Sequence, residues 1–251
     1  MLASERRARI LLAVNAKGVV RVSDLVRELE VSDMTIRRDL IELHRQGLLL
    51  KVHGGATSLH SASEPETSVK MSLHIEIKQR LAAAAAQRVS DGESVALTAG
   101  STCTYVAQEI ARDTRVTVVT NALRVADEFF RNGSHVLLTG GTPTPSAALV
   151  GPVAVQSLEG IHVDTVFAGA HGVSLAGGLM TPNIDEARIN RALLATAHRV
   201  VAVFDHTKWG ISGLATFAAW SDIDTVITDA DVDPVALQHL RDEVPEVVVV
   251  A

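Results

Sequence analysis

The sequence predicts an α/β protein with two unequal parts, a small helix-turn-helix module followed by a larger open α/β domain. Three short amphipathic helical patterns and a hairpin-like run fill the first 58 residues, whereas seven short apolar runs alternate with helical patterns after residue 72. The second arrangement is typical of a mainly parallel sheet covered by helices. A length of 251 residues suits one small and one medium domain. We therefore expect domains at residues 1–58 and 73–251, joined by a linker at 59–72.

The segment after Val31 predicts a helix with one apolar and one basic face. Ser32 is a favourable N-cap, because its side-chain oxygen can accept from a backbone N–H group of the first turn. An apolar stripe with helical spacing follows it, formed by Ile36, Leu40 and Leu43. Arg37 and Arg38 lie on the opposite face, where arginines suit phosphate pairing and bidentate recognition of guanine. On this segment alone, a solvated charged face is an equally good interpretation.

Two shorter helical patterns precede that segment, at residues 5–16 and 22–30. In the first, we expect Arg6, Arg7 and Arg9 to point outward. Ser23 is expected to cap the second. Only a tight connection separates the second and third patterns, which is the helix-turn-helix arrangement.

Residues 48–56 follow Gly47, which is expected to end the third helix, and they predict a β-hairpin. Lys51 and His53 would be exposed on this hairpin, so that it forms a wing able to lie on a phosphate backbone. Through Ser58 the chain has ten Lys and Arg against seven Asp and Glu, whereas the remainder has thirteen against twenty-two. The positive N-terminal module on an acidic body directs attraction for DNA to one end of the protein.

The overall composition is that of an ordinary globular protein, with 47% hydrophobic and 21% charged residues. No apolar run is long enough to cross a bilayer, and the charged start lacks the apolar region of a signal peptide. A single cysteine, Cys103, excludes an intrachain disulfide framework and fits a reducing compartment. There is no Cys/His cluster with zinc spacing. We therefore expect a cytoplasmic protein without a membrane partner, metal or cofactor.

The larger domain alternates predicted strands and helices after a polar linker that contains Pro65. The predicted strands are residues 94–98, 116–120, 135–139, 165–169, 200–204, 225–228 and 246–250. The predicted helices are residues 78–89, 102–111, 123–131, 153–158, 184–197 and 234–241. Ligands of such sheets bind at the carboxyl ends of the strands, where loops lead into helices.

Small polar residues are concentrated at these strand ends. A helix N-terminus with exposed hydroxyl and N–H groups is a natural anion site, and one is predicted at Gly100, Ser101 and Thr102. Further candidate ligand contacts follow four other strands: Thr120, Asn121, Gly140, Gly141, His171, Asp205 and Lys208. Each of these loops by itself is also compatible with a simple tight turn.

Several of these residues have specific alternatives. Lys208 would supply positive charge for an anionic ligand, or it is an exposed lysine before a turn. Asp205 would accept from a sugar hydroxyl. His171 would donate to a phosphate or cap a turn. Cys103 lies near a predicted helix N-terminus, where the helix dipole could lower the pKa of its thiol. No acid–base partner is visible near it in the sequence, so a packing role is favoured. No catalytic residue is predicted.

The N-terminal segment resembles the DeoR family of bacterial transcriptional regulators. The resemblance rests on Val31 to Leu40, with its Arg37-Arg38-Asp39-Leu40 sequence, and on His53-Gly54-Gly55-Ala56. It implies that the third helix enters the major groove of operator DNA. The implied DNA contacts are Ser32, Thr35, Arg37, Arg38, Lys51 and His53. For His53 a purely structural place in the wing is an equal alternative, and for Asp39 we expect a structural pairing with an arginine.

The larger domain resembles the sensor domain of the same family, which is similar in fold to sugar-phosphate isomerases and coenzyme A transferases. The matching segments include Gly100-Ser101-Thr102, 119–121, 139–141, 167–172, 178–181, 205–208 and 224–229. The resemblance implies a phosphorylated sugar or related metabolite as effector. Two residues depart from the family pattern: Thr98 replaces the usual aspartate, and Lys70 replaces the usual arginine.

We therefore expect a homo-oligomeric repressor, a dimer or tetramer, that acts on carbohydrate metabolism genes and is released by a phosphorylated metabolite. Its partners would be double-stranded operator DNA and that effector. The alternative is a sugar-phosphate isomerase-like enzyme with an accessory DNA-binding domain. Aldose–ketose exchange needs a carboxylate base over the substrate, and Thr98 stands at the candidate position.

Overall fold

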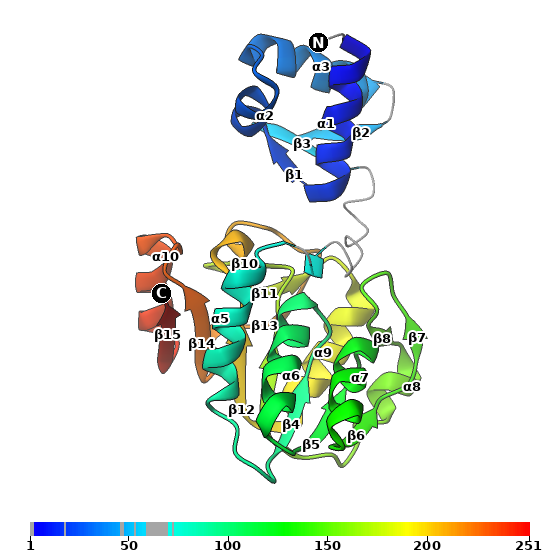
Figure 1. Cartoon of the computed structure of the whole chain (residues 1–251), viewed down its shortest axis with the longest axis vertical. Coiled ribbons are helices and arrows are strands. Elements are labelled where there is room, and N and C mark those ends of the chain that lie inside the picture. Colours follow the sequence, from blue (N-terminus) through cyan, green and yellow to red (C-terminus); the bar gives the residue numbers. More distant parts are fainter. Residues whose placement is uncertain (1–2, 18, 46–47, 53, 59–69, 72) are drawn as a thin grey trace. The chain divides into compact units, whose positions relative to one another are not determined.

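The computed structural model describes residues 3–17, 19–45, 48–52, 54–58, 70–71 and 73–251 (Figure 1). The chain forms two compact units, Met1–Pro65 and Glu66–Ala251. Gly47 and His53, for which the sequence makes specific predictions, lie outside the described residues. In the described part of the chain, no helix is both long and apolar enough to span a membrane.

The N-terminal unit consists of three helices and a three-stranded antiparallel sheet (Figure 1). The helices are α1 (Ala3–Lys17), α2 (Val22–Leu29) and α3 (Asp33–Arg45); the strands are β1 (Val19–Arg21), β2 (Leu49–Val52) and β3 (Gly55–Ser58), in the order β1-β3-β2. Apolar side chains from all three helices fill one core, including Ile10, Val14, Leu25, Ile36 and Leu40. This confirms the predicted winged helix-turn-helix fold.

Three details of this unit differ from the sequence prediction or extend it. The wing has an additional strand, because β1 pairs with β3. A Cβ atom at Gly55 would lie 2.0 Å from the carbonyl oxygen of Val20, so the close approach of these two strands requires glycine. The prediction for Ser23 is wrong, since α2 already begins at Val22 and Arg21 at its N-cap makes no side-chain capping bond. Ser32 does cap α3, and its Oγ lies 3.3 Å from the backbone nitrogen of Thr35.

The C-terminal unit is built on a seven-stranded sheet whose neighbouring strands are all parallel. In spatial order the strands are β15 (Glu246–Val250), β14 (Thr225–Asp229), β12 (Ala197–Val203), β9 (Val163–Ala168), β4 (Ser94–Leu97), β5 (Thr117–Thr120) and β6 (His135–Leu138). These are the seven strands that the sequence predicts. The open α/β fold class is therefore confirmed.

Helices cover both faces of this sheet and give it two apolar cores. One face carries α5 (Ile75–Ala86), α6 (Ser101–Asp113) and α7 (Leu123–Asn132); the other carries α8 (Pro152–Gln156), α9 (Ile184–Ala195) and α10 (Pro234–Glu243). Figure 1 shows the first three helices side by side in front of the sheet.

In the described residues of the C-terminal unit, five further short strands were not predicted, because such short runs carry little periodicity. They are β7 (Thr142–Pro143), β8 (Leu149–Val150), β10 (Gly172–Ser174), β11 (Gly178–Thr181) and β13 (Ala215–Ala218). The last three form an antiparallel sheet of their own. Its residues Val173, Leu179 and Phe217 join the same core as α9.

Candidate functional site

The first turns of α3 present a polar, basic surface. The hydroxyl groups of Ser32 and Thr35 are hydrogen-bonded to each other, with 2.9 Å between their oxygen atoms. Arg37 is held by the carboxylate of Asp33, four residues earlier on the same helix. Arg38 is exposed, and no described residue forms an ion pair with it. Of the two adjacent arginines, Arg38 is therefore the one whose guanidinium group is available to a partner without breaking a bond inside the helix.

Asp39 has a structural role, as expected from the sequence. Its side chain is almost fully buried, and its two carboxylate oxygens accept from Arg6 at 2.5 Å and from Arg7 at 2.9 Å. The prediction that Arg6 and Arg7 point outward is therefore wrong, whereas Arg9 is exposed. This paired carboxylate joins α3 to α1 and so fixes the orientation of the exposed face of α3. On the wing, Lys51 of β2 is exposed as predicted.

The strand order places the second group of candidate residues at one edge of the main sheet. From β4 the chain continues to β5 and β6 on one side of the sheet, whereas from β9 it continues to β12, β14 and β15 on the other side. In open α/β sheets, ligands bind outside the carboxyl ends of the strands where the strand order reverses in this way. The loop after β4 and the loop after β9 meet here, because the backbone nitrogen of Gly169 donates to Oγ1 of Thr98 at 3.1 Å. Thr98 thus ties two strand ends together. This contact gives the unusual threonine a structural role.

Gly100, Ser101 and Thr102 lead from the loop after β4 into α6. Gly100 has φ 138°, which favours glycine, and it is the residue that precedes the helix. Ser101 and Thr102 are buried in the first turn, where backbone N–H groups have no partner within the helix. Cys103 is buried next to them, and burial raises the pKa of its thiol to about 11. Burial of the side chain is consistent with the packing role expected from the sequence.

The loops after β5 and β6 contribute mainly backbone and one buried amide. The hydroxyl of Thr120 donates to Leu97 and accepts from the backbone nitrogen of Ala122, so it is committed to the turn. Asn121 is fully buried, and within the described residues its Oδ1 has no hydrogen-bond partner. Gly140 and Gly141 both have positive φ, at 68° and 112°.

Asp205, His206 and Lys208 follow β12 at the same edge. Asp205 is fully buried and accepts from Thr207 with one carboxylate oxygen. Its other oxygen, Oδ2, has no hydrogen-bond partner among the described residues. Burial acts to raise the pKa of Asp205, but the charge of Lys208 and the bonds from Thr207 outweigh it and hold this pKa below its usual range. This direction favours the ionised carboxylate, and Oδ2 is a buried acceptor that the described residues leave unused.

His171 is half-buried just before β10, and its backbone nitrogen donates to Met180 of β11. Glu186 lies in the first turn of α9, where it is buried and accepts from the hydroxyls of Thr144, Ser146 and Thr181.

Lys78 is a charged residue of this region that sequence reasoning missed. It is 2% exposed and its ammonium group donates to the carbonyl oxygens of Lys70 at 2.5 Å and Leu73 at 2.7 Å. Burial, followed by the charge of Lys208, lowers its pKa to about 8. A signal existed: Lys78 lies on the buried stripe of α5, in register with Leu81, Ala82 and Ala85.

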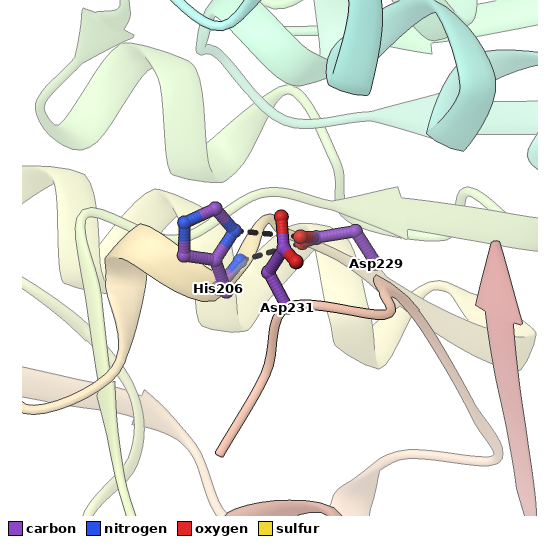
Figure 2. A group of neighbouring side chains, drawn as sticks. All are labelled: His206, Asp229 and Asp231. Carbon is purple, nitrogen blue, oxygen red and sulfur yellow. Dashed lines mark hydrogen bonds and ion pairs between the residues drawn. The ribbon is translucent and has the colours of Figure 1, made fainter. Parts of the chain in front are cut away.

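A group of metal-type donors also lies at the ends of β12 and β14 (Figure 2). The ring Nδ1 and the backbone nitrogen of His206 bond to the carboxylate of Asp229 at 2.6 and 2.7 Å. One donor atom from each of His206, Asp229 and Asp231 lies within 4.8 Å of the others. An imidazole and two carboxylates are suitable ligands for a divalent cation. No metal-ligand spacing is visible in the sequence, because the group forms only when two strands become neighbours. By its hydrogen bonds alone, the group holds the loop after β12 against the end of β14.

Both units match known protein families. Residues 6–62 match the family model of the DeoR-like helix-turn-helix domain, and residues 73–230 match that of the DeoR C terminal sensor domain.

Curated relatives match over almost their full lengths. The transcriptional regulator GlpR of Haloferax volcanii is 37% identical over 93% of this chain and 92% of its own length. GolR of Listeria innocua is 34% identical over 96% of both chains. The lactose phosphotransferase system repressor of Staphylococcus aureus is 33% identical over 90% of this chain and 91% of its own.

Solved structures are more distant. The translation initiation factor eIF-2B of Pyrococcus horikoshii aligns with a TM-score of 0.50 at 11% identity, covering 89% of this chain and 94% of that one, which shows similarity of fold alone. A ribose 5-phosphate isomerase of Methanocaldococcus jannaschii aligns with a TM-score of 0.41 at 17% identity over 54% of each chain.

Proposed function

This chain belongs to the DeoR family of transcriptional regulators, and we propose that it represses carbohydrate metabolism genes until a phosphorylated sugar or related metabolite binds its larger unit. The observation that carries the proposal is that one chain joins a DeoR-like DNA-binding domain to a DeoR sensor domain. One relative, whose alignment covers 90% of this chain, is named as a lactose phosphotransferase system repressor. This name supports repression over activation, and it supports carbohydrate metabolism as the class of regulated genes.

The DNA contact is proposed for the N-terminal turns of α3 and for the wing. Arg38 is assigned to a base edge, since its exposed guanidinium group is not paired within the described residues. Ser32, Thr35 and Arg37 are assigned to the same interface, and Lys51 and His53 to the phosphate backbone. In a homo-oligomer, two copies of α3 would meet repeated half-sites of an operator.

The effector is proposed to bind at the carboxyl edge of the main sheet. The phosphate group would lie at the N-terminus of α6, on Gly100, Ser101 and Thr102, with Lys208 as counter-charge. Sugar hydroxyls would donate to the buried acceptor atoms of Asp205 and Asn121, which are otherwise unpartnered within the described residues. Gly140, Gly141, Thr120 and His171 would line the remainder of the site.

An isomerase activity is not favoured by the residues at this edge. The relatives named above are regulators, and the hydroxyl of Thr98, at the position where a catalytic carboxylate would be expected, is bonded to the N–H of Gly169.

The effector assignment is tested by a thermal-shift panel of phosphorylated sugars on the full chain. We expect at least one compound to raise the melting temperature, with Lys208→Ala losing the response because the counter-charge is gone. Arg124→Ala is the matched control, as it removes an exposed arginine of α7 that has no described partner. A panel without any response, or an unchanged dose response in Lys208→Ala, would contradict this assignment.

A further inference from the structure

We propose that His206, Asp229 and Asp231 form a binding site for a divalent transition-metal ion of the zinc class, at the adjoining ends of β12 and β14. The site is separate from the proposed contacts to DNA, and metal binding itself requires neither DNA nor an effector. The inference therefore goes beyond the proposed function.

The first argument is the geometry of the three side chains. Bonds from Zn²⁺ to nitrogen or oxygen ligands are about 2.0–2.2 Å long, so two ligand atoms of one ion lie at most about 4.4 Å apart. One donor atom from each of the three residues lies within 4.8 Å of the others. Both carboxylates lie on the side of the His206 ring that carries its bond to Asp229 (Figure 2). Small movements of these side chains would therefore bring all three donors onto one ion.

The second argument is the charge balance of the group. Asp229 is 3% exposed, and its ion-pair partner in the described chain is His206, which carries a charge only when it is protonated. No described lysine or arginine forms an ion pair with Asp229 or Asp231. This differs from the buried Asp39, whose two oxygens accept from two arginines. A buried carboxylate needs a counter-charge, and a divalent cation would supply one to both aspartates.

The third argument is the polar surroundings of the group. The ring of His74, which precedes α5, contacts the ring of His206 edge-on, with 6.2 Å between the ring centroids. Asp205 precedes His206 in the chain, is fully buried, and has one oxygen without a hydrogen-bond partner among the described residues. Metal ligands in proteins are held in orientation by such polar neighbours.

The donor set decides which class of cation fits. One imidazole nitrogen with two carboxylates suits Zn²⁺ and similar first-row ions. Ca²⁺ and Mg²⁺ prefer oxygen ligands alone, and Ca²⁺ takes six to eight of them. Three protein ligands leave a position for water on a four-coordinate ion.

A bound ion would fasten the loop after β12 to the end of β14. Hydrogen bonds from His206 to Asp229 already join these two segments. The same loop carries Asp205 and Lys208, so the ion would also hold these two residues in place. This last consequence rests on the proposed effector site, whereas the metal site does not.

The test uses Zn²⁺ as the probe and the untagged full chain, without effector or DNA. Calorimetry should detect one Zn²⁺ site per chain, with an affinity at least about tenfold higher than that for Mg²⁺. Bound Zn²⁺ should also slow hydrogen exchange in the peptides covering residues 204–210 and 229–233.

Two variants locate the bound ion. Asp231→Asn removes an exposed carboxylate that makes no described hydrogen bond, so the fold should persist while Zn²⁺ affinity falls by about tenfold or more. His206→Gln should lower the affinity at least as much, because it removes the nitrogen ligand. The matched controls are Asp113→Asn at the end of α6 and His198→Gln on β12. Both remove exposed residues outside the group and should leave Zn²⁺ affinity unchanged.

The inference is overturned if the unmodified chain binds no Zn²⁺, or binds it no more tightly than Mg²⁺. It is also overturned if Asp231→Asn or a folded His206→Gln keeps the affinity of the unmodified chain, which would indicate an adventitious ion only, on other histidines. If His206→Gln fails to fold, Asp231→Asn decides alone. Because neither effector nor DNA is present, a negative result leaves the proposed function untouched.

Discussion

Each unit of this protein buries a charged side chain, but the two charges are satisfied in opposite ways. In the N-terminal unit, Asp39 is paired on both oxygens with Arg6 and Arg7. In the C-terminal unit, Lys78 is equally buried, but among the described residues its ammonium group bonds to two backbone carbonyls and lies near the charges of Lys208, Asp205 and Lys70. A fully paired buried charge holds a structure together, whereas an incompletely paired one has affinity left for a ligand. Asp39 therefore belongs to the framework that positions α3, whereas Lys78 lies beside the proposed effector site.

The strongest test of the paired side of this comparison is Asp39→Asn. Removing one partner of a buried ionic cluster leaves uncompensated charge and costs about 3–5 kcal/mol. We expect the N-terminal unit to unfold at a much lower denaturant concentration, with operator binding lost as a consequence. Asp33→Asn is the control, because Asp33 forms an exposed pair with Arg37. Equal stability of the two variants in urea unfolding would contradict a structural role for Asp39.

A second, smaller effect should separate the neighbouring arginines of α3. Arg38→Ala should weaken operator binding by about ten- to one-hundred-fold without changing stability, as expected for loss of a base contact. Arg37→Ala should cost less, because Asp33 already holds its guanidinium group. Fluorescence anisotropy at constant salt measures both. If Arg37→Ala lost more operator affinity than Arg38→Ala, then Arg37 and not Arg38 would be the residue that contacts a base edge.

The unpaired side of the comparison predicts a pH dependence of phosphate binding. Since burial and then Lys208 lower the pKa of Lys78 from 10.5 to about 8, the free protein loses this proton as pH rises above 8. Above pH 8 phosphate is already mostly a dianion, so its own charge changes little there. Phosphate affinity should therefore fall above pH 8, by up to about tenfold per pH unit. Calorimetry between pH 7 and 9 measures phosphate affinity as a function of pH. This dependence should be weaker in Lys78→Met. The same pH dependence in the unmodified chain and in Lys78→Met would show that Lys78 does not cause it.

The smallest expected effect is that of Lys51→Ala on the wing. A phosphate contact has no sequence specificity, so the variant should weaken binding to all DNA sequences alike and lower the salt dependence by about one unit of slope. Affinity measured over a series of salt concentrations checks this. A selective loss on one sequence would instead indicate that Lys51 contacts a base.

The sequence predicts the framework of both units well, for physical reasons. Buried parallel strands are continuous apolar runs, so all seven strands of the main sheet are visible in the pattern. Strand β1 of the N-terminal unit is not visible in the sequence pattern, because three residues are too few to show periodicity. A structural role for Asp39, such as pairing with an arginine, could be predicted because a carboxylate on a DNA-binding helix is repelled by phosphates. Its partners could not be predicted, since the helical pattern of residues 5–16 does not distinguish solvent from a neighbouring helix.

The ligand site is less accessible to sequence reasoning, because its residues become neighbours only through the strand order. Tight turns and ligand loops share glycine and threonine, so Thr120 is a candidate whose hydroxyl is in fact committed to its own turn. Lys78 was missed for a different reason. A lysine is typical of an exposed helix face, although its spacing from Leu81, Ala82 and Ala85 places it on the stripe that the structure shows to be buried.

The central claim is that ligand binding in the C-terminal unit controls DNA binding by α3. The most direct test measures the Kd of the full chain for a promoter fragment, at fixed ionic strength, with and without a phosphorylated sugar that raises its melting temperature. The account predicts a Kd at least about tenfold higher with the sugar, as expected for an allosteric coupling of ordinary size. An operator affinity that the sugar leaves unchanged, while it still binds the protein, would contradict it.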